Sequence, residues 1–428
     1  MLNLLKLFVY NIWVHLNFFL IIICSLFIKR RSDKVIFTSS PIINIKYWSE
    51  ALKEININSM TLVSHYFDNI NKKNDFDKYF FEFLPFKNHS SFYDKIFSIT
   101  PVWIYIIKNA KCVVIPFHGI IFKKNTYYLE IFLCRIFNIK TILIPYGSDS
   151  YMYSRIKDPI LQHVMLSDYP NAALEEKMIE RKVFAWSRLA DCVIGGINGI
   201  DGMPRWDVLT PSHLSINTKL YTPKDISEYS TNNGINGYVK IFHTPNHKTI
   251  KGSEYILNSI NELIDEGLKI ELIIVQNQKN DELMKSLKDG DILISQIIGS
   301  GYALSGIEGM TLGLPVIGNL SHPIYTRVFR YYSFLNECPI LSSPYEDLKS
   351  NIKLLVENPE LRKELGQLGR KYVEKYHSYK AAQYMFTNIF KKLEGEDIDL
   401  MNLYHPLKSD YVKLNYIKTP LINNKYDG

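Results

Sequence analysis

The sequence predicts an α/β protein with two doubly wound, Rossmann-like domains that face a cleft, preceded by an N-terminal hydrophobic helix. Three observations lead to this prediction. Short apolar runs alternate with helical patterns along most of the 428 residues, which is typical of parallel sheets with helices on both faces. A polar segment from about Leu220 to Gly237 has no apolar period and separates two such alternations. A long segment without charged side chains lies near the N-terminus.

The N-terminal segment from Leu7 to Ile28 contains no formally charged side chain and is followed at once by the basic residues 29–31. It is long enough to span a bilayer, and no small-residue cleavage site precedes the basic cluster. Residues 1–31 are therefore a predicted membrane anchor, and the basic cluster places the rest of the chain on the cytoplasmic side of the inner membrane. A helix that lies in the membrane interface is the alternative, because four polar residues interrupt the segment: Asn11, His15, Asn17 and Ser25.

The two alternations predict a first domain at residues 32–222 and a second at 238–393, followed by a tail at 394–428. In the first domain the expected strands are 35–38, 59–63, 112–116, 141–144 and 191–194, and the expected helices are 46–54 and 126–136. In the second, strands are expected from Val239 and at 270–275, 292–294 and 316–317, with helical patterns at 254–266 and 345–392.

Residues 291–317 have the pattern of strand, glycine loop, helix and strand. Gly299, Ser300 and Gly301 allow a tight turn, and Leu304, Ile307 and Met310 recur at helical spacing. The first N–H groups and the positive dipole end of such a helix favour an anion beyond the carboxyl end of the strand. The loop from Gly299 to Tyr302 is therefore a candidate phosphate-binding loop.

Glu308 lies inside this helix, where its carboxylate could accept two hydrogen bonds from a ribose diol. The alternative is a solvated surface glutamate. Gly309 and Gly313 stand close to it in the helical pattern, and each costs a helix about 1 kcal/mol relative to Ala. A close approach to the backbone is a better explanation of these glycines than a solvated surface.

The run from Gly301 to Ile317, GYALSGIEGMTLGLPVI, resembles the donor-binding signature of GT-B fold glycosyltransferases, in the large retaining, glycogen synthase-like group (glycosyl transferases group 1) that uses nucleotide sugars. The resemblance implies that Glu308 holds the nucleotide ribose. The family has a second glutamate at the place of Ser300, against the transferred sugar. The substitution leaves the donor sugar and the stereochemical outcome, retaining or inverting, open.

A second matching segment is IFHTPNHKTIKG, from Ile241 to Gly252, which resembles the basic loop after the first strand of the family's nucleotide domain. Lys248 and Lys251 are spaced so that both ammonium groups could converge on one diphosphate. Fixed cations of this kind stabilise the charge of a departing nucleoside diphosphate, and they would replace a metal ion. A solvated basic loop is the alternative.

The first domain is expected to supply the acceptor side. His118 and Asp149 each follow a predicted strand, at the sheet edge where ligands gather in open α/β folds. His118 could contact the donor sugar or act as a base, because an imidazole titrates near neutral pH. The alternatives are a loop histidine and an ordinary turn or helix-cap aspartate.

Composition and short motifs exclude several other classes of protein. The net charge is +7, but no zinc spacing, recognition helix or aromatic RNA-binding motif accompanies it, so we expect no nucleic-acid partner. The five cysteines are scattered and lie mostly in apolar runs, which favours a reducing compartment. Metal-dependent transferases carry an Asp-x-Asp pair at the end of a strand. The pairs in this sequence all lie away from predicted strand ends: 75/77, 289/291 and 397/399. We therefore expect neither a metal nor a resident cofactor.

The sequence thus favours a membrane-associated glycosyltransferase that moves a sugar from a nucleotide-diphosphate donor to a lipid-linked or surface-polysaccharide acceptor. Two alternatives stay open. A GT-B fold nucleotide-sugar epimerase would bind the donor but would need no anchor. A non-catalytic protein of polysaccharide assembly would keep the fold without turnover, and Ser300 is the residue that favours it.

Overall fold

The computed structural model describes residues 2–67, 71–84, 97–122, 126–276 and 278–426. They form two compact units that do not follow chain order. Unit 1 comprises residues 1–150, 175–194 and 203–206, and unit 2 comprises residues 151–174, 195–202 and 207–428. The expected first domain at 32–222 and tail at 394–428 differ from this division, because three pieces before residue 222 and the whole tail pack with the second sheet.

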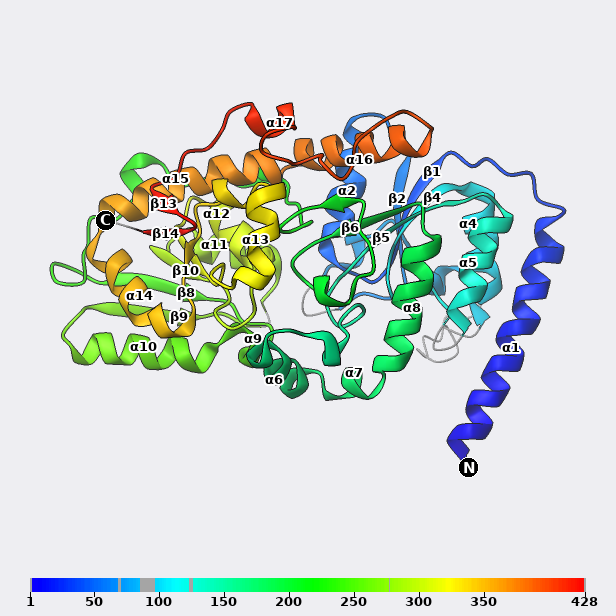
Figure 1. Cartoon of the computed structure of the whole chain (residues 1–428), viewed down its shortest axis with the longest axis horizontal. Helices are drawn as coiled ribbons and strands as arrows, with labels where there is room; N and C mark the ends of the chain where they lie inside the picture. The colour runs from blue at the N-terminus through cyan, green and yellow to red at the C-terminus, as the bar shows by residue number, and fades with distance from the viewer. Residues whose placement is uncertain (1, 68–70, 85–96, 123–125, 277, 427–428) are drawn as a thin grey trace. The chain divides into compact units, whose positions relative to one another are not determined.

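Unit 1 is built on a parallel sheet with strand order β3-β2-β1-β4-β5-β6 (Figure 1). Most residues of these strands are buried on both faces, as expected for a sheet covered by helices on both sides; every residue of β2 is buried. The strands are β1 (Lys34–Ser39), β2 (Ser59–Val63), β3 (Lys78–Tyr79), β4 (Ala110–Pro116), β5 (Lys140–Ile144) and β6 (Cys192–Gly195), and the helices are α1 (Leu2–Ser25), α2 (Ile43–Glu54), α4 (Ile99–Asn109), α5 (Tyr127–Ile136) and α8 (Glu176–Leu189).

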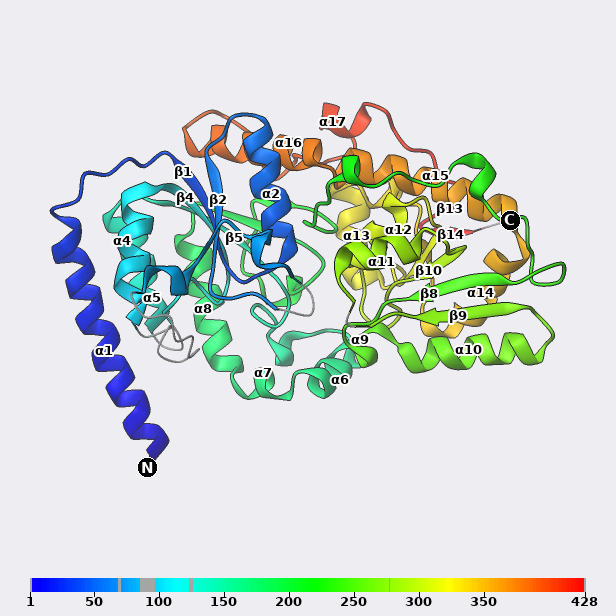
Figure 2. The same ribbon diagram turned by 180° about the vertical axis from the view of Figure 1, so that it is seen from behind.

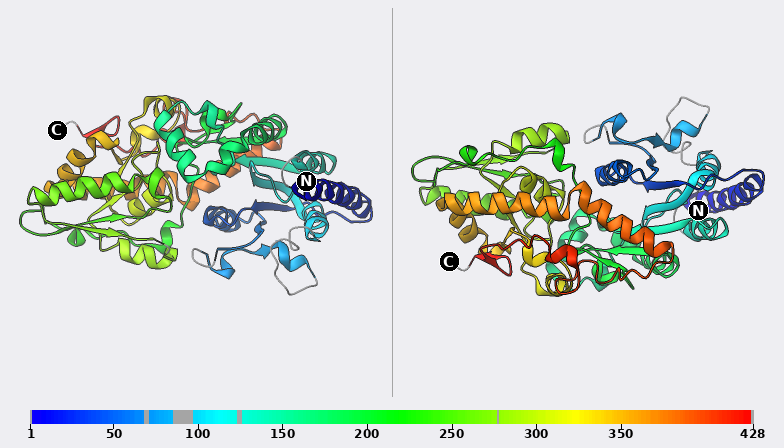
Figure 3. Two further views of the ribbon diagram at one scale, coloured as in Figure 1. Left: turned by 90° about the horizontal axis from the view of Figure 1, so that it is seen from below. Right: turned by 90° about the horizontal axis from the view of Figure 1, so that it is seen from above.

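Helix α1 packs against α4 along one of its faces. Val14 and Ile21 on that face have no solvent exposure, and Thr100 Oγ1 donates a hydrogen bond of 2.6 Å to Asn17 Oδ1. Within the described residues, α1 is the one helix long and apolar enough to cross a membrane, with a mean hydropathy of 1.8 over Phe8–Ser25. The two views in Figure 3 show α1 alongside α4 and α5.

Unit 2 contains a five-stranded parallel sheet with strand order β12-β11-β10-β8-β9. The order reverses between β8 and β10, which makes this point of the sheet a topological switch point. The strands are β8 (Val239–His243), β9 (Ile270–Ile274), β10 (Ile292–Ile294), β11 (Val316–Gly318) and β12 (Leu341–Ser342).

Helices cover both faces of the second sheet. Figure 2 shows α10 (Ser253–Asp265) on one side and α11 (Asn280–Leu287) with α12 (Leu304–Thr311) on the other. Apolar side chains of α10 and of α14 (Leu348–Glu357) join those of the strands in one core. The other elements of unit 2 are α6 (Pro159–Asp168), α7 (Pro170–Leu174), β7 (Val208–Leu209), α9 (Lys248–Lys251), α13 (Pro323–Tyr332), α15 (Pro359–Tyr376), α16 (Tyr379–Leu393), α17 (Asp410–Lys413), β13 (Leu421–Ile422) and β14 (Lys425–Tyr426).

The predicted fold class is confirmed, since both units are doubly wound α/β structures and unit 1 begins with an apolar helix. Most expected elements end within one to three residues of the observed ones. The two glycines have different structural reasons. A Cβ at Gly309 would lie 2.5 Å from Leu293 Cδ2 of β10, so close packing of helix on strand explains this residue. Gly313 follows the end of α12 with φ +80°, a conformation that favours glycine.

Candidate nucleotide-binding site

Three loops meet at the carboxyl edge of the unit 2 sheet. They follow β8, β10 and β11, which are neighbouring parallel strands. Backbone hydrogen bonds join them: Ile297 N–H donates to Lys251 O at 3.2 Å, and Gly301 N–H donates to Asn319 O at 2.8 Å. This edge is where ligands bind in open α/β sheets, and Lys251, Ser300 and Glu308 lie on the elements that form it.

Lys251 is buried at this edge, with 6% of its surface exposed. Its Nζ donates a hydrogen bond of 3.2 Å to Gln296 Oε1. The amide nitrogen of Gln296 in turn donates to the carbonyls of Gly299 and Ser300 at 3.1 and 3.3 Å. Burial lowers the pKa of the Lys251 ammonium to about 8, against the opposing charge of Glu308. Gln296 thus ties the lysine to the glycine loop.

Glu308 is also buried, with 4% of its surface exposed. Its Oε1 accepts a hydrogen bond of 2.5 Å from Asn280 Nδ2, at the start of α11. Burial raises the pKa of its carboxyl to about 7, and the Asn280 hydrogen bond and the charge of Lys251 oppose this effect. The structure therefore places Glu308 inside the protein, where its charge and that of Lys251 favour each other's ionised form, and not on a solvated face.

The glycine loop is buried from Gly299 to Tyr302. Gly301 has φ +102°, a conformation that favours glycine. The hydroxyl of Ser300 is buried and has no hydrogen-bond partner in the described part of the chain. Helix α12 begins at Leu304, with Ala303 as its N-cap, so the helix starts after the loop and not within it.

Tyr302, which the sequence suggested for the donor site, turns its side chain into the core. His377 Nδ1 donates to Leu214 O at 2.7 Å, so its Nε2 accepts from the Tyr302 hydroxyl at 2.9 Å. The Tyr302 hydroxyl also lies 2.8 Å from that of Tyr372. These contacts occupy the Tyr302 hydroxyl, and the buried side chain anchors the glycine loop to the core.

Lys248 and Lys251 share the single turn of α9 but have different surroundings. Lys248 is exposed, whereas Lys251 is buried. The turn is held by neighbouring groups of unit 2: Ile250 N–H donates to Asp168 Oδ2 at 3.1 Å, and the ring of His247 packs against Tyr169 with centroids 4.8 Å apart. One of the two predicted cations is thus fixed within the protein and the other reaches solvent.

His243, at the end of β8, lies beneath the site. Its Nδ1 donates to Ile294 O at 2.9 Å, and its Nε2 accepts from Ser253 Oγ at 2.9 Å. Burial lowers the pKa of this imidazole to about 4, so the ring is neutral at physiological pH. It joins β8, β10 and the start of α10, and its role is structural.

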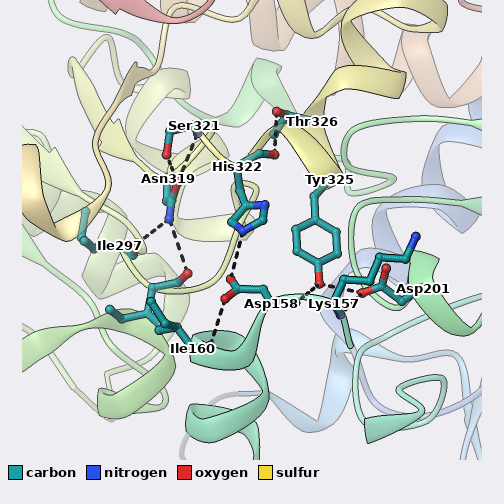
Figure 4. A network of polar contacts seen from close by, with 11 residues as sticks. Lys157, Asp158, Ile160, Asp201, Ile297, Asn319, Ser321, His322, Tyr325 and Thr326 are labelled. Atoms are coloured by element: carbon teal, nitrogen blue, oxygen red, sulfur yellow. Dashed lines mark hydrogen bonds and ion pairs between the residues drawn. The ribbon is translucent and has the colours of Figure 1, made fainter. Parts of the chain in front are cut away.

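The loop after β11 carries a polar network that Figure 4 shows from close by. Asn319 Nδ2 donates to Ile297 O at 2.8 Å. His322 Nε2 lies 3.8 Å from Asp158 Oδ2, and the other oxygen of Asp158 caps α6 by accepting from Ile160 N–H. The Tyr325 hydroxyl donates to Asp201 at 2.6 Å. The network joins the glycine loop to α6 and to residues 195–202, all within unit 2.

Gln296, Asn280 and His322 were not among the residues predicted from the sequence. Gln296 and His322 follow β10 and β11 within a few residues. Their position just beyond a predicted strand was the feature of the sequence that could have indicated them. Asn280 begins α11, and nothing local links it to Glu308. Among the described residues, no group of three or more potential metal ligands occurs.

The two candidates in unit 1, His118 and Asp149, lie in the loops after β4 and β5. Asp149 accepts hydrogen bonds from Phe117 N–H and Tyr146 N–H, both at 2.9 Å. Burial raises the pKa of its carboxyl to about 6, against these amides and the charge of Lys182. Both oxygens are used to join the ends of β4 and β5, which matches the turn alternative. His118 is exposed, with Nε2 3.0 Å from Ser40 Oγ.

Two solved structures share this architecture. Sucrose-phosphate synthase from Thermosynechococcus elongatus is 13% identical, and the match covers 85% of this chain and 99% of that chain at a TM-score of 0.51. A variant of S. aureus TarM, in complex with fondaparinux, α-GlcNAc-glycerol and UDP, is 10% identical, and the match covers 84% of this chain and 99% of that chain at a TM-score of 0.52. No protein-family model matches the chain. The chain has the GT-B fold, as the sequence predicted.

Proposed function

We propose that this protein is a membrane-associated, metal-independent glycosyltransferase. It moves a sugar from a nucleotide-diphosphate donor to a lipid-linked or surface-polysaccharide acceptor. One observation supports this most: a buried lysine and a buried glutamate, coupled electrostatically, at the carboxyl edge of the unit 2 sheet. Buried ionisable groups with perturbed pKa values gather at functional sites, and Gln296 links this lysine to the glycine loop.

In the proposed reaction the bond between the sugar C1 and the diphosphate oxygen breaks, and negative charge develops on the departing diphosphate. Lys251 stabilises this charge, because a fixed cation in a desolvated site needs no reorganisation. The first amides of α12 add the positive end of its dipole. Glu308 accepts hydrogen bonds from the ribose hydroxyls, and Lys248 contacts the outer phosphate from the exposed end of α9.

The acceptor hydroxyl must lose a proton as the new bond forms. His118 is our candidate for this base, since its ring is exposed at the end of β4. Asp149 is the weaker candidate because two backbone amides already occupy its carboxylate. The complex of TarM with UDP and α-GlcNAc-glycerol supports a nucleoside-diphosphate donor, and α1 supports an acceptor that is held at a membrane.

The test is incubation of the full chain with a panel of nucleotide sugars, with and without lipid extract that contains isoprenoid-linked acceptors. The proposal expects nucleoside diphosphate to be released only when an acceptor is added. Glu308→Gln should weaken donor binding, since a hydrogen bond to a charged group contributes ~1.5–3 kcal/mol, which corresponds to roughly 10- to 100-fold. The exposed Glu254 of α10 provides the matched control, and Glu254→Gln should leave donor binding unchanged.

Two other outcomes would replace the proposal. Conversion of the donor sugar without nucleotide release would indicate an epimerase. Donor binding that depends on Glu308 without any turnover would indicate a non-catalytic protein. Ser300 is the observation that favours the latter, because its buried hydroxyl stands where the family has a glutamate.

A further inference from the structure

Helix α1 has two faces with different surroundings. One face packs on the rest of unit 1, and its residues Val14, Asn17 and Ile21 are at most 6% exposed. Large apolar side chains on the opposite side stay open to solvent at helical spacing: Phe8, Ile12, Leu16, Phe19 and Ile23, each between 47% and 62% exposed. Side chains of this second face, together with Asn11 and His15, line a shallow hollow of about 430 Å³. The helix is thus docked on the protein along one side and uncovered along the other.

The uncovered apolar surface continues onto α5. Tyr128, Phe132 and Ile136 recur at intervals of four residues and are 37%, 57% and 54% exposed, so they form one stripe along α5. The stripe adjoins α1, because His15 Nε2 lies 2.7 Å from the Tyr128 hydroxyl. Exposed apolar patches that extend over several elements mark protein–protein or membrane contacts.

A basic groove borders the stripe on its other side. It has a volume of about 510 Å³ and lies between Tyr127, helix α8 and residues 204–205. Arg181, Arg188 and Arg205 line it together with Phe184. Arg135 on α5 donates to the carbonyl of Leu189 on α8, which holds the two helices together. Arg181 and Arg188 are exposed, so their charges face solvent at the margin of the apolar surface.

We propose that α1, the α5 stripe and this arginine groove form one membrane face, which docks on an anionic lipid bilayer with α1 in the plane of the membrane. The inference rests on the proposed membrane association and specifies its geometry and partner. Apolar side chains enter the outer part of the hydrocarbon region, and the arginines contact lipid phosphates at its margin. This is the arrangement of a monotopic protein.

The packing of α1 argues against a spanning helix. A span has to cross about 30 Å of hydrocarbon. Helix α1 is held to α4, and α4 leads directly into β4 of the central sheet. A span would therefore either strip Val14, Asn17 and Ile21 from their contacts or draw α4 and the strand that follows it into lipid, where exposed backbone groups cannot be satisfied.

The first test measures depth in the membrane. Spin labels are attached to the full chain at single cysteines, introduced as Ile12→Cys, Leu16→Cys, Phe19→Cys and Ile23→Cys on α1 and Phe132→Cys on α5, with Cys24→Ala as background. Each position is exposed, so the label does not disturb the core. The protein is bound to phosphatidylglycerol-containing vesicles, and accessibility to oxygen and to a water-soluble nickel reagent gives the depth. Ile235→Cys, exposed in unit 2, is the control.

The proposal expects one similar, shallow depth at all four α1 positions and at Phe132→Cys, with the control in water. A depth profile that rises to a maximum in the middle of α1, with Phe132→Cys in water, would show a spanning helix and overturn the proposal. Labels in water at every position, with a mass that doubles in solution, would assign the face to a second copy of the chain and overturn it as well.

The second test addresses the charge. Arg181→Gln and Arg188→Gln should each weaken binding to anionic vesicles about 5-fold, the effect expected for one basic residue near an anionic surface, and added salt should reduce the difference. Arg327→Gln, exposed on α13 of unit 2, is the control. Equal binding of all variants would contradict the role of the groove. Neither test uses a donor or turnover, so failure of the proposed glycosyl transfer would leave both results interpretable.

Discussion

Replacing Lys251 by methionine separates the functional from the structural cost of this buried cation. Burial lowers the pKa of Lys251 from 10.5 to about 8, and each pKa unit corresponds to about 1.4 kcal/mol. Keeping the lysine protonated at pH 7 therefore costs the folded protein ~3 kcal/mol. Methionine fills a similar volume without charge, so Lys251→Met should be more stable than the wild type at pH 7 while its affinity for nucleoside diphosphates falls at least 10-fold.

The stability difference between Lys251→Met and the wild type should depend on pH. Below about pH 8 the lysine is protonated in both the folded and unfolded states, and the full cost is present. As pH rises from about 8 toward 10.5, the folded state releases its proton first, so the stability of the wild type increases with pH. The advantage of Lys251→Met should therefore be ~3 kcal/mol at pH 7 and clearly smaller at pH 9.5.

The assay can distinguish the two units. All five tryptophans lie in unit 1: Trp13, Trp48, Trp103, Trp186 and Trp206. Tryptophan fluorescence therefore reports the unfolding of unit 1, whereas far-UV circular dichroism reports both units. Urea unfolding of Lys251→Met should move the dichroism transition and leave the fluorescence transition in place. Lys248→Met, at an exposed site on the same turn, is the control and should change neither. A variant less stable than the wild type at pH 7, or an advantage that is equal at pH 7 and 9.5, would refute the reasoning.

Two further predictions concern the same site. Affinity for nucleoside diphosphates, measured by calorimetry, should depend on pH as a bell-shaped curve. It should fall as Glu308 gains its proton below about pH 7 and as Lys251 loses its proton above about pH 8. Lys251→Met should remove the alkaline limb of the curve, and an alkaline limb that persists in this variant would show that another group causes it. Tyr302→Phe leaves His377 and Tyr372 without their buried hydrogen-bond partner, so the free energy of unfolding should fall by ~1–3 kcal/mol. Nucleotide affinity should be close to that of the wild type. A large loss of affinity at unchanged stability would instead place the Tyr302 hydroxyl in the binding site.

The fold was accessible from the sequence because its signals are local. The strand 292–294 was predicted with its observed bounds, since three apolar residues between a polar turn and a glycine loop leave little choice. The segment 151–174 was not recognised as part of unit 2. Its assignment depends on contacts such as Asp158 with His322 and Asp168 with Ile250, which join residues far apart in the chain and leave no periodic pattern.

The site residues stay a prediction, and the structure bears on only some of their surroundings. The burial of Glu308 agrees with the interpretation that it is not a surface residue, because the glycines around it indicated tight packing. Its partner Asn280 could not be found, since the hydrogen bond depends on how α11 crosses the sheet. Tyr302 was assigned to the ligand by its position beside the glycine loop, but its side chain is buried and its hydroxyl lies between His377 and Tyr372, which are far away in the chain.

The most direct measurement of the central claim is hydrogen exchange of the full chain with and without saturating nucleoside diphosphates, tested one base at a time. If the carboxyl edge of the unit 2 sheet holds the nucleotide, at least one nucleoside diphosphate should slow exchange in residues 248–252 and 299–308, and Glu308→Gln should reduce the effect while Glu254→Gln preserves it. Protection confined to other segments, or none with any base, would contradict the account.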